Sequence, residues 1–292
     1  MAATPGQGDA MKLVRYGPRG RERPGLIDAD GVLRDLSMYV RDFDGASLAP
    51  ARLAALRRLA PQDLPAVRGR PRLGVPVAGV GKIVAIGLNY RAHAAGGHTL
   101  PEEPILFLKA TSSLCGPHDP VRLPQGATQG DWEVELAMVI GQRAARVSAE
   151  RALDFVAGYS VANDVSERSY QFDRGPTWDK GKSCDTFCPL GPWLATRDEV
   201  PDPQALDLWL TFDGETMQRS NTADMLFSCA EIVAFVSRFM TLHPGDVILT
   251  GTPPGSGFLQ TPPRFLRHGA RMRLGISGLG EHRSRVVAGT AR

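Results

Sequence analysis

Two glutamates, Glu133 and Glu135, are the residues of this chain that most directly indicate chemistry. They lie in the segment 131–141, whose β-branched and aliphatic residues and terminal glycine predict a strand. Residues two apart in a strand share a face, so both carboxylates are expected to point the same way. Burying like charges together costs stability unless a positive charge lies between them, and the strand contains no Lys or Arg. The pattern therefore predicts a bound cation.

A third carboxylate belongs to the same interpretation. The apolar run 155–162 predicts a buried strand that leads directly into Asn163 and Asp164. Functional groups often lie where strands end and loops begin. Three carboxylates with no Cys or His at ligand spacing form an all-oxygen set, which suits Mg²⁺, Mn²⁺ or Ca²⁺ rather than Zn²⁺. The alternative is a solvated edge strand followed by a turn at Asn163.

The elements that must position these carboxylates predict a mostly β fold with some α, an α+β architecture. Alternating or buried apolar runs indicate strands, and Gly and Pro mark the turns between them. An amphipathic pattern predicts a helix over 229–239, and a second, shorter helix is expected over 51–59. Further strands are expected at 11–16, 23–33, 82–87, 104–109 and 207–212, and within 242–255.

Composition divides the chain into three parts. Residues 1–10 are expected to be a disordered leader, because they are small and polar. Residues 11–76 form a small N-terminal domain without a reactive cluster, and it ends in a proline-rich linker. Residues 80–292 hold the carboxylates and are expected to form a second, larger domain.

Charge and composition argue against several classes of protein. The formal net charge is only +3 and basic residues are spread among acidic ones, so no nucleic-acid partner is expected. No run of 18 apolar residues occurs, so no membrane span is expected. Residues 1–10 lack the basic start and apolar stretch of a secretory signal. Four cysteines without a Cys-x-x-Cys pair fit a reducing compartment, and a cytoplasmic protein is therefore expected.

Several short motifs follow one another in order from about Lys82 to the C-terminus. They are Asn89-Tyr90-x-x-His93, Asp131-Trp132-Glu133-Val134-Glu135-Leu136, Asn163-Asp164-Val165-Ser166-x-Arg168, Gly181-Lys182-Ser183-x-Asp185, Asn221-Thr222-x-Asp224-Met225 and Pro244-Gly245-Asp246-Val247-Ile248-x-Thr250-Gly251-Thr252-Pro253. In this order the motifs together resemble the fumarylacetoacetate hydrolase family. The similarity is greatest to its 2,4-diketo-3-deoxy-sugar-acid hydrolase and acylpyruvase-like branch, because of the segment Gly181-Lys182-Ser183-Cys184-Asp185-Thr186-Phe187.

This resemblance implies a β-roll catalytic domain in a homodimer, with Mg²⁺ or Mn²⁺ on Glu133, Glu135 and Asp164. It implies catalytic roles for His93, as the base that activates water, and for Lys182, as a charge that stabilises an oxyanion. Arg168, Gln171 and Thr252 match substrate-binding positions, and we add Lys109 from the end of the 104–109 strand. Each of these residues could instead have a structural role, and Lys182 could be an exposed loop lysine.

The segment that follows His93 departs from the family pattern. Hydrolytic and decarboxylating relatives show His-x-x-Glu, whose glutamate orients the imidazole, whereas this chain has His93-Ala94-Ala95-Gly96. Glu102, Glu103 or His98 could fold back from a mobile surface loop to replace that glutamate. A positioned acid or base contributes roughly 10²–10⁴ in rate, so this change bears on the reaction.

The expected function is metal-dependent hydrolysis of a C–C bond in a 2,4-diketo acid, an acylpyruvate-like substrate. A 2-oxo acid can chelate a divalent ion, which then stabilises the enolate that forms when the neighbouring bond breaks. The alternatives are isomerisation, tautomerisation, decarboxylation or dehydration of a related 2-oxo acid without activated water, and a non-catalytic metal-binding homologue.

Overall fold

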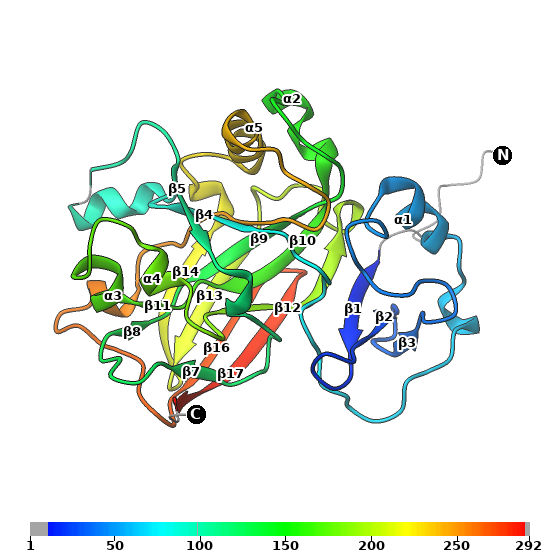
Figure 1. Ribbon diagram of the computed structural model, residues 1–292, viewed down its shortest axis with the longest axis horizontal. Coiled ribbons are helices and arrows are strands. Elements are labelled where there is room, and N and C mark those ends of the chain that lie inside the picture. Colours follow the sequence, from blue (N-terminus) through cyan, green and yellow to red (C-terminus); the bar gives the residue numbers. More distant parts are fainter. Residues whose placement is uncertain (1–10, 98, 290–292) are drawn as a thin grey trace.

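The computed structural model describes residues 11–97 and 99–289, so the leader expected over 1–10 lies outside the described residues. The structure confirms the expected α+β class, with most of the regular structure in β-sheets and only short helices around them (Figure 1). The strands and the helix predicted at 229–239 all occur, with ends that differ by a few residues.

A large sheet of ten strands runs through the molecule. Its order is β3-β2-β1-β12-β10-β9-β15-β4-β5, and β6 also pairs with β12. The central strands β9, β10 and β15 are buried along their whole lengths. The strands are β1 (Lys12–Tyr16), β2 (Arg23–Ile27), β3 (Leu33–Asp35), β4 (Ile83–Gly87), β5 (Ile105–Lys109), β6 (Leu114–Cys115), β9 (Val134–Ile140), β10 (Val156–Asn163), β12 (Cys188–Thr196) and β15 (Val247–Leu249).

A second sheet of five strands, ordered β14-β13-β16-β17-β7, lies beside the large one. A two-stranded pair, β8 with β11, lies next to the start of β9. The strands are β7 (Val121–Leu123), β13 (Asp207–Phe212), β14 (Glu215–Asn221), β16 (Arg271–Ile276), β17 (Gly280–Ala288), β8 (Gly130–Asp131) and β11 (Ser166–Glu167).

The helices lie at the periphery of the sheets (Figure 1). The longest, α5, begins at a capping box formed by Ser228 and Glu231. In Figure 1, α3 and α4 lie together beside β8 and β11. The α-helices are α1 (Pro50–Arg57), α2 (Ala149–Ala152), α3 (Arg168–Phe172), α4 (Asp179–Lys182) and α5 (Cys229–Phe239), and the 3₁₀ turn η2 spans Arg91–Gly96.

Strand β9 separates two hydrophobic cores, as its period-two pattern predicts. Val134, Leu136 and Met138 on one face pack with the second sheet and α5. Ala137 and Val139 on the other face pack with apolar residues of the N-terminal part. Because the sheet is covered on both sides here, Glu133 and Glu135, at the beginning of this segment, lie at the edge of a core.

The N-terminal strands continue the large sheet. Strand β1 pairs with β12, with Lys12 opposite Ala195 and Leu13 opposite Leu194. Leu13 and Leu26 also share a core with the central strands β9 and β15. The division into domains over 11–76 and 80–292 stays a prediction.

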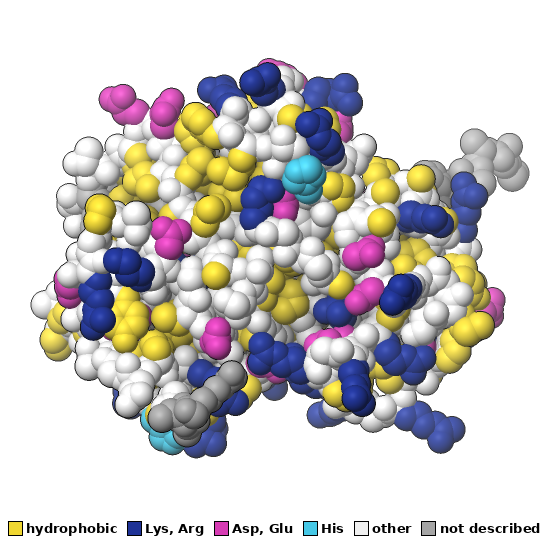
Figure 2. Space-filling view, viewed as in Figure 1, with side chains coloured by type: hydrophobic (Ala, Val, Ile, Leu, Met, Phe, Trp, Pro, Cys, Tyr) yellow, Lys and Arg dark blue, Asp and Glu magenta, His cyan; other side chains and the backbone are white. Residues whose placement is uncertain are grey.

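Charges of both signs are interspersed over the face drawn in Figure 2, where apolar side chains form separate patches. None of the helices in the part of the chain that the structure describes is both long and apolar enough to cross a bilayer.

Candidate functional site

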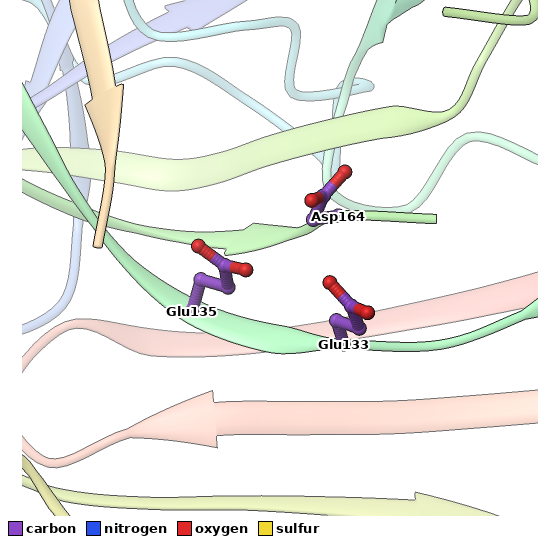
Figure 3. Close-up of side chains that lie close together, drawn as sticks. All are labelled: Glu133, Glu135 and Asp164. Atoms are coloured by element: carbon purple, nitrogen blue, oxygen red, sulfur yellow. The ribbon is translucent and has the colours of Figure 1, made fainter. Parts of the chain in front are cut away.

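The antiparallel pair of β9 and β10 brings three carboxylates together. Ala162 of β10 lies opposite Glu135 of β9, and the backbone amide of Asp164 donates to the Glu133 carbonyl at 2.9 Å. Figure 3 shows the side chains of Glu133, Glu135 and Asp164 gathered on the same side of these strands. One oxygen from each lies within 4.8 Å of the others, and all three residues are buried. Strand periodicity and a single register therefore produce the cluster.

The strand contains no positive residue, but three cations from other elements contact these carboxylates. Lys182 Nζ donates to Glu133 Oε2 at 2.8 Å and to Asp164 Oδ2 at 2.7 Å. Arg168 donates to Glu133 Oε1 at 2.5 Å, and Lys109 Nζ lies 2.5 Å from Asp164 Oδ1. These cations come from α4, α3 and β5, so the composition of the strand itself could not reveal them.

The ion pairs set the protonation of the paired groups. Burial acts to raise the pKa of Glu133, but the charges of Lys182 and Arg168 more than offset it and hold the pKa below its ordinary value. Burial acts to lower the pKa of Lys182, and Asp164 and Glu133 overcome that effect and raise it. At neutral pH, Glu133 is therefore a carboxylate and Lys182 an ammonium group.

Glu135 differs from the other two carboxylates because it forms no ion pair with any described residue. Its Oε2 accepts a hydrogen bond from the Gly251 amide at 2.7 Å. Burial, together with repulsion from Asp164 and Glu133, raises its pKa well above the ordinary value. The amide comes this close because Gly251 has a φ of 95°, and a Cβ there would lie 2.8 Å from the Asn89 Cβ.

The spacing of the carboxylate oxygens fits a divalent cation, and the cluster retains a negative charge that would attract one. Four buried carboxylates, from Glu133, Glu135, Asp164 and the adjacent Asp131, face three cations, which leaves one negative charge that Glu135 must neutralise by binding a proton or a cation. Opposed oxygens around Mg²⁺, Mn²⁺ or Ca²⁺ lie roughly 4 to 5 Å apart. The spacing of 4.8 Å or less among the three ligand atoms matches that requirement.

His93, in η2, is buried and is held by a backbone carbonyl. Its Nε2 lies 2.9 Å from the Thr252 carbonyl oxygen. Because a carbonyl can only accept, Nε2 carries the proton, and Nδ1 is the basic nitrogen of the neutral ring. The Thr252 carbonyl thus fixes the tautomer. Of the expected replacements for the family's glutamate, Glu102 and Glu103 are exposed, and His98 lies outside the described residues.

Gln218 is a site residue that sequence reasoning missed. Its side chain is buried and donates to Thr252 Oγ1 at 2.7 Å and to the Pro253 carbonyl at 2.8 Å. It also accepts from the Val134 amide at 3.0 Å. Gln218 therefore links the loop that contains Thr252 to the start of β9 by hydrogen bonds. Nothing in its own strand, which is largely exposed, signals this role.

Asp131, quoted in a motif but given no role, connects Arg168 to the loop after β15. Arg168 Nε donates to Asp131 Oδ2 at 2.8 Å, and the amides of Gly257 and Phe258 donate to the same carboxylate. Arg168 also donates to Gln171 Oε1 at 2.9 Å. The guanidinium is therefore fixed on three sides before any substrate arrives.

A cavity of about 210 Å³ opens beside the carboxylates. Of the four residues expected to bind substrate, Arg168, Gln171 and Thr252 line it, whereas Lys109 lies behind Asp164 and outside the lining. Ser256 also reaches the cavity. The polar lining residues are His93, Glu133, Glu135, Arg168, Gln171, Lys182, Thr252 and Ser256.

Comparison with known proteins places this geometry in a class. The fumarylacetoacetate hydrolase C-terminal family model matches residues 82–287. A protein of Burkholderia lata, provisionally named a hydrolase, is 56% identical over 273 residues, which cover 93% of this chain and 97% of the relative. The fold and the three-carboxylate site thus define a β-rich enzyme with a buried acidic cluster.

Solved structures agree. Fumarylacetoacetate hydrolase from Exiguobacterium antarcticum is 34% identical with a TM-score of 0.81. Maleylpyruvate hydrolase from Sphingobium sp. SYK-6, determined with manganese(II) and pyruvate, is 32% identical with a TM-score of 0.80. A 5-carboxymethyl-2-hydroxymuconate delta-isomerase from Mycobacterium smegmatis is 33% identical with a TM-score of 0.75. Each match covers 96% of this chain and 100% of the other. The chain belongs to the fumarylacetoacetate hydrolase family, whose members include hydrolases and isomerases.

Proposed function

We propose that this protein is a divalent-metal-dependent hydrolase that cleaves a C–C bond in a 2,4-diketo acid of the acylpyruvate type. The observation that carries the proposal is the cluster of three buried carboxylates, of which Glu133 and Glu135 line a cavity that His93 and Lys182 also line. Glu133, Glu135 and Asp164 would hold Mg²⁺ or Mn²⁺, for which their oxygen donors are suited. A bound ion of this kind supplies Lewis-acid stabilisation of negative charge on a chelating 2-oxo acid.

Lys182 is the residue that would stabilise charge from the protein side. It is buried, and its ammonium group, fixed by Glu133 and Asp164, reaches the cavity. A fixed ammonium in a dry site stabilises developing negative charge without reorganisation. Lys182 is therefore proposed to stabilise the oxygen that gains negative charge when the C–C bond breaks.

His93 is the proposed base. Its protonated Nε2 is committed to the Thr252 carbonyl, so the proton of an attacking water would pass to Nδ1. The imidazolium so formed would be stabilised by its hydrogen bond to that carbonyl. Substitution His93→Asn should reduce hydrolysis by at least a hundredfold while Mg²⁺ binding is unchanged.

One alternative at the same site is isomerisation or tautomerisation, in which no water needs to be activated. Two similar structures carry isomerase names, the Mycobacterium smegmatis delta-isomerase and a 2-hydroxyhepta-2,4-diene-1,7-dioate isomerase from Mycobacterium marinum. Decarboxylation or dehydration would use the same site. A non-catalytic role is the remaining alternative, and it has least support because the polar groups converge on a cavity.

A panel of substrates distinguishes these reactions. The purified protein with Mg²⁺ or Mn²⁺ is incubated with acylpyruvates, oxaloacetate and diketo sugar acids, and the products are separated by chromatography. Pyruvate together with the matching carboxylic acid would support the proposal. A rearranged product with all its carbons, or a decarboxylated product with one carbon fewer, would support the alternative reactions. EDTA should abolish either kind of reaction. Absence of any product across the panel would refute both.

The quaternary structure belongs to the same proposal. We propose a homodimer, as the family resemblance implies, that acts on a small 2-oxo acid in the cytoplasm. Sedimentation equilibrium should give twice the chain mass, and a mass equal to one chain would contradict it.

A further inference from the structure

The cavity beside the carboxylates changes character along its length. Its polar groups are deep, since Glu135, Lys182 and Gln171 are each at most 3% exposed. Phe172, Phe258 and Leu259 are 39–46% exposed and therefore lie at its mouth. A substrate whose oxo acid end reaches the carboxylates must place its other end among these apolar side chains.

Four aromatic rings form a continuous wall from Phe107, whose ring centroid lies 5.0 Å from the Lys182 Nζ, to the mouth. Trp178 packs edge-on against Phe107 at 5.3 Å between ring centroids and against Phe172 at 6.2 Å. Phe172 in turn contacts Phe258 at 5.4 Å. Gly87 lies beneath this wall, where a Cβ would come within 2.7 Å of the Trp178 ring. The rings contact one another across segments far apart in the chain, which indicates a built surface.

No cation among the described lining residues remains to receive a second carboxylate at this end. Arg168 and Lys182 are the lining cations, and both are already paired with the buried carboxylates. Described cations on neighbouring segments lie outside the lining and have other partners. Lys180 donates to the Arg174 carbonyl, Arg174 stacks on the Tyr170 ring at 4.3 Å, and Arg91 donates to the Met225 carbonyl. A charged or polyhydroxylated far end would therefore gain no ion pair from the described lining residues, whereas an apolar end would bury its surface against the rings.

We infer that the acyl group of the substrate is apolar, an alkyl or aryl group that packs on Phe107, Phe172, Trp178 and Phe258. This inference rests on the proposed function for the 2-oxo acid end of the site. It excludes dicarboxylates and sugar acids as preferred substrates and names Trp178 and Phe258 as specificity-determining residues.

Binding of simple 2-oxo acids in the presence of Mg²⁺ tests the inference without requiring turnover. Isothermal titration calorimetry compares 2-oxoglutarate with 5-methyl-2-oxohexanoate, in which an isopropyl group replaces the distal carboxylate at nearly the same shape. We expect the apolar acid to bind at least tenfold more tightly. In the series 2-oxobutanoate, 2-oxopentanoate and 2-oxohexanoate, affinity should rise about fourfold per methylene group.

Variants assign this preference to the aromatic wall. Phe258→Ala, at an already exposed ring, and Trp178→Ala should flatten the chain-length series without weakening pyruvate binding. Phe172→Lys should raise the affinity for 2-oxoglutarate. The matched control is Phe239→Ala, which removes a ring that is 64% exposed at the end of α5 and should leave the series unchanged.

Each outcome decides the inference. The inference would be overturned if the wild-type protein bound 2-oxobutanoate, 2-oxopentanoate and 2-oxohexanoate equally tightly, or bound 2-oxoglutarate as tightly as 5-methyl-2-oxohexanoate. Failure of every 2-oxo acid to bind would also overturn it. Apolar acids that bind in the predicted order while the matching acylpyruvates stay uncleaved would leave the inference standing and refute the proposed reaction.

Discussion

Replacing Lys182 by methionine removes the ammonium that lies between two buried carboxylates while keeping most of the side-chain volume. Glu133 would keep Arg168, and Asp164 would keep Lys109, but the shared positive charge would be gone. Removing one partner of a buried ion pair costs about 3–5 kcal/mol, because an uncompensated charge remains. With roughly 2–4 °C per kcal/mol for a chain of this size, the melting temperature should fall by about 6–20 °C in EDTA.

Divalent ions and acid should both reduce that loss. A bound Mg²⁺ or Mn²⁺ would supply the missing positive charge, so the variant should gain more stability from the ion than the wild type does. Burial raises the pKa of Glu133, but the charge of Lys182, with that of Arg168, lowers it below its ordinary value. The Glu133–Lys182 pair therefore stabilises the fold at neutral pH, and this contribution is lost as the pH falls through the lowered pKa. The difference between wild type and Lys182→Met should therefore shrink on acidification.

Thermal unfolding with and without EDTA measures this effect. Lys180→Met is the matched control, because it changes an exposed lysine on the same helix. The reasoning is refuted if Lys180→Met destabilises the protein as much, or if Lys182→Met unfolds at the wild-type temperature in EDTA.

Two further predictions follow from the buried groups around the site. Because burial and its acidic neighbours raise the pKa of Glu135, the group binds a proton more readily than an exposed glutamate, and a divalent ion competes with that proton. Calorimetry in buffers of different ionisation enthalpy should show that protons are released when the divalent ion binds, and the affinity for the ion should rise with pH. Binding heats that do not depend on the buffer would contradict this prediction. Asn89→Ala should cost about 2–4 kcal/mol in urea unfolding, since the fully buried amide donates to the Thr250 and Phe227 carbonyls and accepts from the Phe227 amide. A loss below 0.5 kcal/mol would show that these bonds are replaced.

The sequence was sufficient to predict the three carboxylates because their signals are local. The period-two pattern of β9 places Glu133 and Glu135 on one face, and the end of an apolar run marks Asp164. One strand pairing then brings all three together. The same local logic explains why the strands and the helix at 229–239 were predicted, since each depends on the periodicity of a short segment.

The surroundings of the carboxylates could not be predicted in this way. The partners of Glu133 lie 35 and 49 residues away, and the carbonyl that holds His93 lies 159 residues away. No local pattern encodes such contacts, because they depend on how strands far apart in the chain are ordered in the sheet. The strand itself contains no Lys or Arg, so its own pattern gave no sign that Lys109, Arg168 and Lys182 contact the cluster.

The most direct test of the central claim is the binding of Mn²⁺ to the protein and to its Glu135→Gln variant, followed by electron paramagnetic resonance. Glu150→Gln, which changes an exposed glutamate on α2, is the control. We predict one tightly bound Mn²⁺ per chain in the wild type and in the control, and loss of that binding in Glu135→Gln. Equal affinity in all three proteins would contradict the assignment of Glu133, Glu135 and Asp164 as a metal site.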